Sequence, residues 1–349
     1  MLPLLNMNNN LFSFSKYCGC AAKLDSNTLK KVISKIQNRK KLNLLIGFEN
    51  YDDCGVFRIN HDHAILSTVD INTPMVKDGY IFGQIAACNS LSDIYAMGGE
   101  PLTCLNILGY PDHLDLKTTK EILEGALDKI NESEACLLGG HTMKNEQLFF
   151  GLSVNGIINP NDIWTNKDAQ SGDLLILTKP IGLGVLFSAN KKNKLSKSGF
   201  QKCLKYATTL NKYAYLVMKD YNINSVTDVA GFGLLGHVLE IARASKKTIA
   251  LNLESIPVIK EAIKMYENGI DTSITKLNIK NTINDTNINE NIDKSIIKLL
   301  ADPQTNGGLL FSLPKKEANR CLGQLHKKGL TEATIIGSVT EFSKKHILV

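Results

Sequence analysis

The spacing of hydrophobic positions in the first half of the chain predicts helices interleaved with strands. Amphipathic patterns predict helices over 26–40, which opens with a Ser/Asn cap, and over 118–133. Residues 79–97 are rich in alanine and spaced like a buried helix, which Gly98 and Gly99 end. Short alternating or apolar runs predict strands at 63–70, 101–110, 135–140 and 147–158.

The second half repeats this mixture. Strands are predicted at 173–180, 248–254, 307–313 and 333–340, with a helix over 317–329 and a strand, turn and helix over 226–245. The Asn-rich stretch 268–293 is predicted to be a surface loop. Because helices and strands interleave without strict βαβ spacing, the pattern favours α+β domains over a doubly wound sheet.

Chain length and local composition divide the sequence. With 349 residues the chain exceeds the size at which one core stops growing, so two domains are expected. Residues 159–172 shift to Asn, Asp, Ser and Gly, which is typical of a boundary. We therefore predict a mobile N-terminal segment over 1–23, an N-terminal domain over 24–160 and a C-terminal domain over 172–349.

Composition excludes several classes of protein. Hydrophobic residues make up 43% of the chain, as in ordinary globular proteins, and the net charge of +6 is spread without a basic stripe, so no nucleic-acid partner is expected. The eight cysteines are mostly isolated in apolar runs, unlike a secreted disulfide scaffold. Without a signal-like leader or a stretch that would span a bilayer, the expectation is a cytoplasmic protein with no membrane partner.

The segment CGCAAK carries the first candidate chemistry. Cys18 and Cys20 lie one residue apart among small residues, and Lys23 follows. A nearby ammonium group lowers the pKa of a thiol and favours the reactive thiolate. The spacing alone is equally compatible with an ordinary exposed pair of cysteines, because C-x-C has no unique geometry.

Aspartates at the ends of predicted elements form a second candidate. Asp52, Asp53, Asp70, Asp93 and Asp228 come from four remote segments. Mg²⁺ prefers carboxylate oxygens together with substrate phosphates, whereas a single aspartate commonly caps a helix or a turn. Asp93 is harder to explain as a cap, because a carboxylate within an apolar helix is costly to bury unless it binds something.

Glycine turns form a third candidate. LLGGHT (137–142), GFGLLGH (231–237) and TNGG (305–308) allow backbone N–H groups to approach a phosphate. His141 and His237 taken singly are more typical of structural histidines. The chain has no P-loop, dinucleotide fingerprint, HExxH, paired CxxC, GxSxG or kinase signature.

In order along the chain, GCAAK, DDCGVF, STVD, AACNSLSDIYAMGGEPL, LLGGHT, TKPIGLGVL, TDVAGFGLLGH and DPQTNGG resemble the selenophosphate synthetases (selenide, water dikinases). This family belongs to the superfamily of aminoimidazole ribonucleotide synthetase. The resemblance runs from about residue 18 to the end. It implies a two-domain α+β fold with a sheet-rich, ATP-binding N-terminal domain and a C-terminal α+β domain.

The resemblance also implies roles for individual residues. Cys20 matches the family's catalytic cysteine or selenocysteine, and Lys23 the essential lysine that meets the nucleotide phosphates. Asp53, Asp93 and Asp228 match the metal-binding aspartates. Positions that match the nucleotide-contacting segments are Lys23, Asn50, Tyr51, Asp52, Asp70, Asp93, Gly140, His141 and Thr142.

The implied reaction converts ATP, selenide and water to selenophosphate, AMP and phosphate with Mg²⁺, and so supplies activated selenium for selenocysteine or selenouridine synthesis. A homodimer joined through the N-terminal domains and a possible selenium-donor protein are the implied partners. Two alternatives stay open at this point. In the first alternative, the chain is another ATP-using member of the superfamily. In the second, it is a non-catalytic selenium or metal carrier that uses Cys18 and Cys20.

Overall fold

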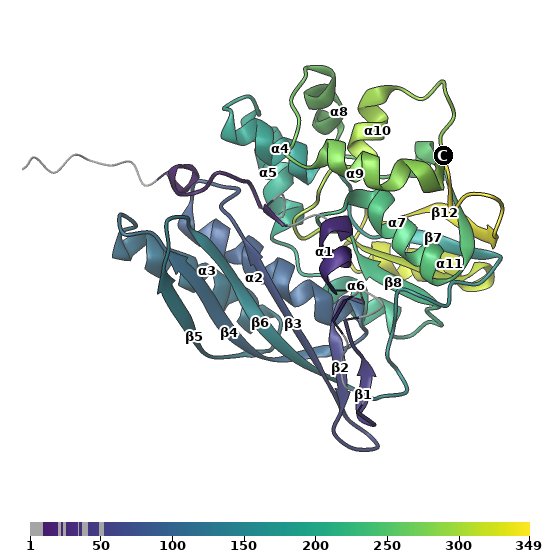
Figure 1. Cartoon of the computed structure of the whole chain (residues 1–349), viewed down its shortest axis with the longest axis horizontal. Helices are drawn as coiled ribbons and strands as arrows, with labels where there is room; N and C mark the ends of the chain where they lie inside the picture. The colour runs from purple at the N-terminus through teal and green to yellow at the C-terminus, as the bar shows by residue number, and fades with distance from the viewer. Residues whose placement is uncertain (1–9, 20–21, 24–25, 34, 37–40, 49–51) are drawn as a thin grey trace, which may run out of the picture.

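The computed structural model describes residues 10–349 except 20–21, 24–25, 34, 37–40 and 49–51. It contains two mixed sheets with their helices, joined near residue 160 (Figure 1). The elements of the first half are the short helix η1 (Leu11–Phe14), α1 (Ser26–Ile33), β1 (Leu44–Ile46), β2 (Gly55–Arg58), β3 (Ala64–Asn72), α2 (Gly79–Ala96), β4 (Glu100–Tyr110), α3 (Leu116–Glu132), β5 (Cys136–Lys144) and β6 (Phe149–Ile158). No helix in the described ranges has the length and apolarity that a bilayer crossing requires.

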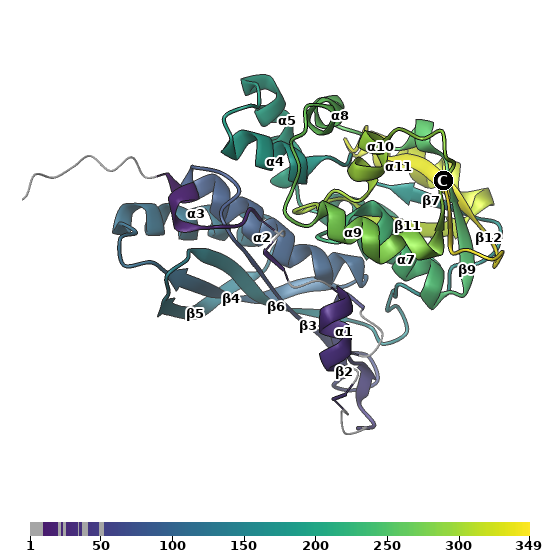
Figure 2. The ribbon, with the colours of Figure 1, turned by 45° about the horizontal axis from the view of Figure 1, so that its top comes forward.

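The first sheet has six strands in the order β1-β2-β3-β6-β4-β5. Helices α2 and α3 cover one face, and Figure 2 shows no helix of the described chain on the other face of β3–β6–β4–β5. Glycine permits the two helices to pack closely. A Cβ on Gly83 would lie 1.9 Å from the carbonyl oxygen of Ile122, and one on Gly125 would lie 1.9 Å from that of Tyr80.

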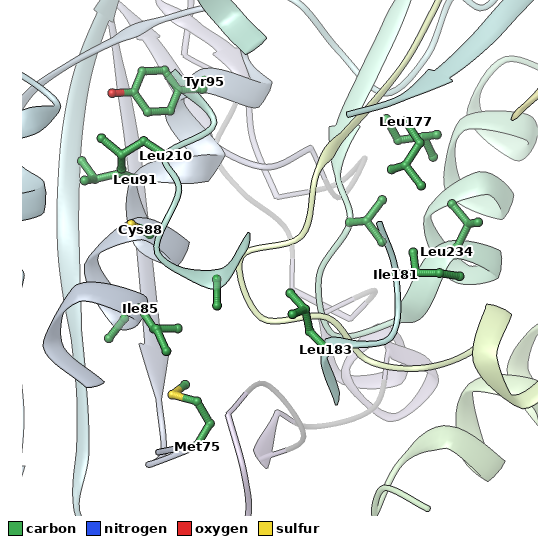
Figure 3. Packing of buried hydrophobic residues seen from close by; sticks show 14 of the residues in the cluster. Met75, Ile85, Cys88, Leu91, Tyr95, Leu177, Ile181, Leu183, Leu210 and Leu234 are labelled. Carbon is green, nitrogen blue, oxygen red and sulfur yellow. The ribbon is translucent and has the colours of Figure 1, made fainter. Parts of the chain in front are cut away.

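Helix α2 is buried on almost every side. The residue before the helix is Asp78, and its side chain caps the N-terminus by accepting a hydrogen bond from the backbone N–H of Ile81. One face packs on the first sheet and α3, and the other packs on the second half of the chain, which explains the apolar pattern all round the helix. Figure 3 shows Leu91 and Tyr95 of α2 in the same apolar cluster as Leu210 from the second half.

The second sheet has seven strands in the order β10-β13-β9-β12-β7-β11-β8. Its elements are β7 (Asp173–Leu177), α4 (Leu183–Lys191), α5 (Lys197–Ala207), α6 (Lys212–Met218), β8 (Ser225–Asp228), α7 (Gly233–Ala244), β9 (Lys247–Leu251), η3 (Leu253–Ser255), α8 (Lys260–Glu267), α9 (Thr275–Thr282), η4 (Ile283–Asp285), β10 (Thr286–Asn287), α10 (Lys294–Leu300), β11 (Leu309–Pro314), α11 (Lys315–Lys327), β12 (Thr334–Glu341) and β13 (Ile347–Leu348). Strand β8 lies at the edge of this sheet and packs against α2, which brings the two halves together.

The Asn-rich stretch 268–293 differs from the predicted surface loop. It contains helix α9 and the short strand β10, because several of its polar residues are buried with internal partners. Asn278 donates from its side-chain amide to the carbonyl oxygens of Gly231 and Ala301, both at 3.0 Å. Polar composition therefore concealed a helix that is held by side-chain hydrogen bonds. The first predicted helix is described as α1 over Ser26–Ile33, and residues 34 and 37–40 of the predicted range lie outside the described residues.

The N-terminal segment follows a packed course where it is described, over 10–19. Leu11 is fully buried, and the backbone N–H of Gly19 donates to the carbonyl oxygen of Thr73 at the end of β3 (3.1 Å). Lys191 of α4 donates to the carbonyl oxygen of Ser15 (2.9 Å). Any movement of this segment must therefore break contacts to both halves of the chain.

Candidate active site

Three carboxylates that are remote in the sequence meet between the two halves of the chain. Asp53 precedes β2, Asp93 lies on α2, and Asp228 ends β8. One carboxylate oxygen of each lies within 4.8 Å of those of the other two. The first half supplies two of these aspartates and the second half supplies the third.

Neighbouring hydroxyl groups orient the three carboxylates. Each donates one hydrogen bond: Thr68 Oγ1 to Asp93 Oδ2 (2.6 Å), Ser92 Oγ to Asp228 Oδ2 (2.7 Å) and Thr227 Oγ1 to Asp53 Oδ1 (3.2 Å). Because carboxylates accept several bonds, oxygen lone pairs remain for another ligand.

The electrostatic environment of the cluster is unfavourable for three free charges. Burial raises the pKa of Asp53 and of Asp93 well above the ordinary aspartate value, and the negative charge of Asp228 raises both further. Burial also raises the pKa of Asp228, while the neighbouring His237 lowers it. Buried like charges at this separation are stabilised by a cation between them.

The donor set fits a hard divalent cation. All three groups offer carboxylate oxygen, which Mg²⁺ prefers, and none of the three is a sulfur or imidazole ligand. Asp53, Asp93 and Asp228 are therefore the residues that would hold such a cation.

Beside the cluster, Lys23 and Asp70 form an ion pair. Lys23 Nζ lies 2.7 Å from Asp70 Oδ2, and the side chain of Lys23 is 35% exposed whereas that of Asp70 is 7% exposed. The side-chain amide of Asn89, on α2, donates to the same Asp70 oxygen at 2.6 Å. Gly19 holds the segment that carries Lys23 close to this point. Its φ is +56°, and a Cβ there would lie 2.6 Å from Thr305 Oγ1, so only glycine fits.

A pocket of about 440 Å³ joins these groups, within the ~300–1,000 Å³ range of ligand sites. Its lining residues are Lys23, Asp53, Thr68, Val69, Asp70, Ile71, Asp93, Asp228, Ala230, Gly231, Phe232 and His237. His237 Nε2 accepts from the backbone N–H of Ala230 (3.0 Å), which places the ring proton on Nδ1, 3.0 Å from Glu240 Oε2. His237 thus holds the glycine turn that forms one wall of the pocket.

The remaining predicted residues of the segments 18–23 and 50–53 are Cys20, Asn50, Tyr51 and Asp52. Asp52 accepts from the backbone N–H of Asn166 (3.2 Å) and does not line the pocket. Cys20, Asn50 and Tyr51 lie outside the described residues. Their predicted roles remain predictions.

Gly140, His141 and Thr142 lie away from the pocket, on edge strand β5. Through β6 and β4, Asp70 of β3 is in register with Gly140 of β5. Three strand spacings separate the two residues by about 14 Å within one chain. All three residues of β5 are exposed.

A second pocket, of about 490 Å³, lies between α6 and α11. Its charged lining comprises Arg320, Lys327, Lys328 and a single carboxylate, Asp220. Arg320 stacks over the ring of Tyr221 at 5.2 Å. Among the predicted site residues that the structure describes, none lines this groove, and its cations are exposed, so the acidic pocket is the better candidate for catalysis.

Sequence analysis missed the polar side chains that support the carboxylates. Asn89, Ser92 and Asp93 are spaced i, i+3, i+4 within the apolar helix α2, so they share one helix face. This spacing could have identified Asn89 and Ser92 from the sequence as neighbours of Asp93 on one polar helix face. Thr68 precedes Asp70 by two residues in β3 and therefore shares its face of the sheet.

Family models and solved structures define the class of protein. Residues 51–158 match the N-terminal domain of AIR synthase related proteins, and residues 170–349 match the C-terminal domain. The chain is similar to *Aquifex aeolicus* thiamine monophosphate kinase at a TM-score of 0.64, with 17% identity over 93% of this chain and 94% of that one. It is also similar to a chain of a HypE–HypF complex at a TM-score of 0.66, with 16% identity over 92% and 94%. The fold is therefore the predicted two-domain AIR synthase-like α+β fold.

Curated relatives define the family within this class. A selenide, water dikinase of *Clostridioides difficile* is 43% identical over 95% of both chains. Another from *Clostridium botulinum* (strain Eklund 17B / Type B) is 40% identical over 97% of this chain and 98% of the relative. The chain belongs to the selenide, water dikinase family of enzymes, as its motifs predicted.

Proposed function

We propose that the acidic pocket binds the triphosphate of ATP with Mg²⁺ and that the chain makes selenophosphate from selenide. The observation that carries this proposal is the meeting of Asp53, Asp93 and Asp228 beside the Lys23–Asp70 pair in one pocket. A metal or selenium carrier has no need for a lysine and a further carboxylate at the edge of such a cluster.

The reaction breaks both phosphoanhydride bonds of ATP. One phosphoryl group goes to selenium and forms the P–Se bond, the other goes to water as orthophosphate, and AMP remains. Bound Mg²⁺ supplies neutralisation of the polyphosphate charge. Lys23, half-exposed at the mouth of the pocket, stabilises negative charge on the transferred group. Asp70 accepts from the ammonium group of Lys23 and is itself held by the side-chain amide of Asn89.

Selenide requires positioning more than deprotonation, because hydroselenide is already nucleophilic at neutral pH. The segment 10–19 leads the chain to Thr73 beside the end of β3, and in the sequence Cys20 precedes the pocket residue Lys23 by three positions. We assign Cys20 the receipt of selenium from a donor protein or the guidance of selenide, as a prediction that rests on the family resemblance.

Anaerobic incubation with ATP, Mg²⁺ and selenide, followed by ³¹P NMR, tests the function. The expected products are selenophosphate, AMP and orthophosphate in equal amounts. ADP as the final nucleotide, or nucleotide turnover that does not depend on selenide, would identify a superfamily kinase of different specificity. A parallel sample without selenide measures wasteful hydrolysis.

We further propose that the enzyme is a homodimer joined through the open face of its first sheet. This face exposes apolar side chains from four strands, namely Phe57, Val69, Ile71, Leu105 and Met143. Contiguous exposed apolar surface of this kind is typical of an interaction site, and a two-fold axis pairs the same patch on both subunits. Val69 and Ile71 also line the pocket, so the partner would lie next to the nucleotide.

In such a dimer, Gly140, His141 and Thr142 of one subunit would contact the nucleotide bound by the other. This arrangement accounts for their position about 14 Å from Asp70 within one chain. His141 lies on the open face, in register with Ile107 and, through Gly151, with Ile71.

Two inactive variants are therefore expected to complement each other. Asp93→Asn destroys one subunit's pocket, and His141→Glu places a carboxylate against the partner's nucleotide. A heterodimer of the two, purified through two different tags, has one intact site and is expected to show about half of the wild-type activity. Selenide-dependent AMP formation measures this recovery. Heterodimers as inactive as both parents would contradict a shared site.

A further inference from the structure

Asn211 is a buried polar residue that the chemistry above does not use. It directly precedes α6 in the second half, is 1% exposed and makes no capping hydrogen bond with its side chain. Its Nδ2 lies 2.8 Å from Ser92 Oγ and 2.9 Å from the carbonyl oxygen of Gly307. Its Oδ1 has no hydrogen-bond partner among the described residues.

These contacts determine the direction of the Ser92 hydroxyl proton. The carbonyl oxygen of Gly307 can only accept, so the Asn211 atom that contacts it must be the amide nitrogen. The same nitrogen contacts Ser92 Oγ, which must therefore accept as well. The single hydroxyl proton of Ser92 is then left for Asp228 Oδ2, at 2.7 Å.

We propose that Asn211 is a positioning residue that orients the proposed metal ligand Asp228 through Ser92. The proposal rests on the metal site proposed above. Without the Asn211 amide, the Ser92 hydroxyl is free to turn towards other acceptors, for example the carbonyl oxygen of the preceding helical turn. Asp228 then loses the hydrogen bond that fixes its rotation, and the carboxylate no longer faces Asp53 and Asp93 in one orientation.

The contact also joins the two halves of the chain. Ser92 lies on α2, whereas Asn211, Gly307 and Asp228 belong to the second half. The chain of hydrogen bonds from Gly307 through Asn211 and Ser92 to Asp228 thus runs across the boundary that the three metal ligands share. Changes in such supporting residues typically lower metal affinity by about 10- to 100-fold.

Mn²⁺ titration of the full-length protein, followed by the EPR signal of free Mn²⁺, tests the proposal without nucleotide or turnover. Asn211→Leu removes the amide but keeps a branched side chain of similar shape. It is expected to weaken Mn²⁺ binding by about tenfold, and Ser92→Ala by a similar factor. Because both act on one hydrogen bond, the double variant is expected to bind Mn²⁺ about as weakly as Ser92→Ala alone.

Asn224 provides a matched control. Its amide also donates to a carboxylate, Asp173, at 2.9 and 3.0 Å, but away from the pocket. Asn224→Ala is expected to change thermal stability without changing Mn²⁺ affinity. If Asn211→Leu does not fold, Asn211→Ala carries the same prediction.

Three results would overturn the proposal. The first is wild-type Mn²⁺ affinity in a folded Asn211 variant. The second is a double variant whose loss of Mn²⁺ affinity equals the product of the two single losses. A wild-type protein that binds Mn²⁺ no better than Asp228→Asn would remove the metal site itself, which distinguishes failure of the proposed site from failure of the role of Asn211.

Discussion

Replacement of Lys23 by alanine is expected to lower the rate of selenophosphate formation by about a thousandfold or more, the range found when a cation that stabilises phosphoryl transfer is removed. Lys23 Nζ is the ammonium group paired with Asp70 at the pocket, so its loss leaves the charge on the transferred phosphoryl group without that partner. The protein itself should remain folded, because Lys23 is 35% exposed and the buried Asp70 keeps its hydrogen bond from Asn89. Anaerobic assays that follow AMP and selenophosphate measure the effect.

Lys77 offers a matched control for the lysine substitution. It is exposed, contacts Asn193 at 3.3 Å and does not line the pocket. Lys77→Ala should therefore keep near wild-type activity. Lys23→Arg keeps the positive charge and is expected to retain more activity than Lys23→Ala. Retention of more than about a tenth of wild-type activity by Lys23→Ala would contradict charge stabilisation by this residue.

Replacement of Asp93 by asparagine is expected to abolish activity and yet to stabilise the metal-free protein. Burial and then the charge of Asp228 raise the pKa of Asp93. The folded protein therefore holds a proton that the unfolded chain releases above about pH 4, and the free energy of unfolding falls as the pH rises above that value. Asparagine can still accept a hydrogen bond from Thr68 but carries no charge. In the variant, the free energy of unfolding therefore no longer falls with rising pH on account of this residue.

Thermal unfolding in EDTA as a function of pH measures the expected stabilisation of the metal-free protein by Asp93→Asn. At neutral pH, the metal-free Asp93→Asn variant is expected to gain about 1 kcal/mol or more, or ~2–4 °C in Tm. Added Mg²⁺ should raise the Tm of the wild type and leave that of the variant nearly unchanged. A metal-free variant that is less stable than the wild type at neutral pH would show that the three carboxylates do not repel one another.

Much of the fold could be predicted because periodicity and breakers agree with tertiary packing. The buried helix α2 is the clearest example, since its apolar character on all sides required neighbours on all sides. Helix α9 could not be predicted in this way. Thr275, Asn278 and Thr282 are buried through side-chain hydrogen bonds, and a polar residue with an internal partner has the same sequence pattern as a solvated one.

The candidate site could be predicted only in part for the same reason. Asp93 was conspicuous because it interrupts an apolar helix, whereas Ser92 and Asn211 are 119 positions apart and nothing in the sequence joins them. Gly140, His141 and Thr142 show another limit. The predicted glycine turn is wrong, because these residues lie within strand β5, and their distance from Asp70 depends on the strand order of the sheet, which periodicity does not specify.

The division of the three aspartates between the two halves of the chain has a thermodynamic consequence. A cation held by Asp53, Asp93 and Asp228 acts as a non-covalent cross-link, because it can bind fully only when both halves are folded and docked. Its binding free energy is then shared by both halves. Bound magnesium would thus couple the unfolding of the two halves more tightly, and neither half expressed alone would gain this stabilisation.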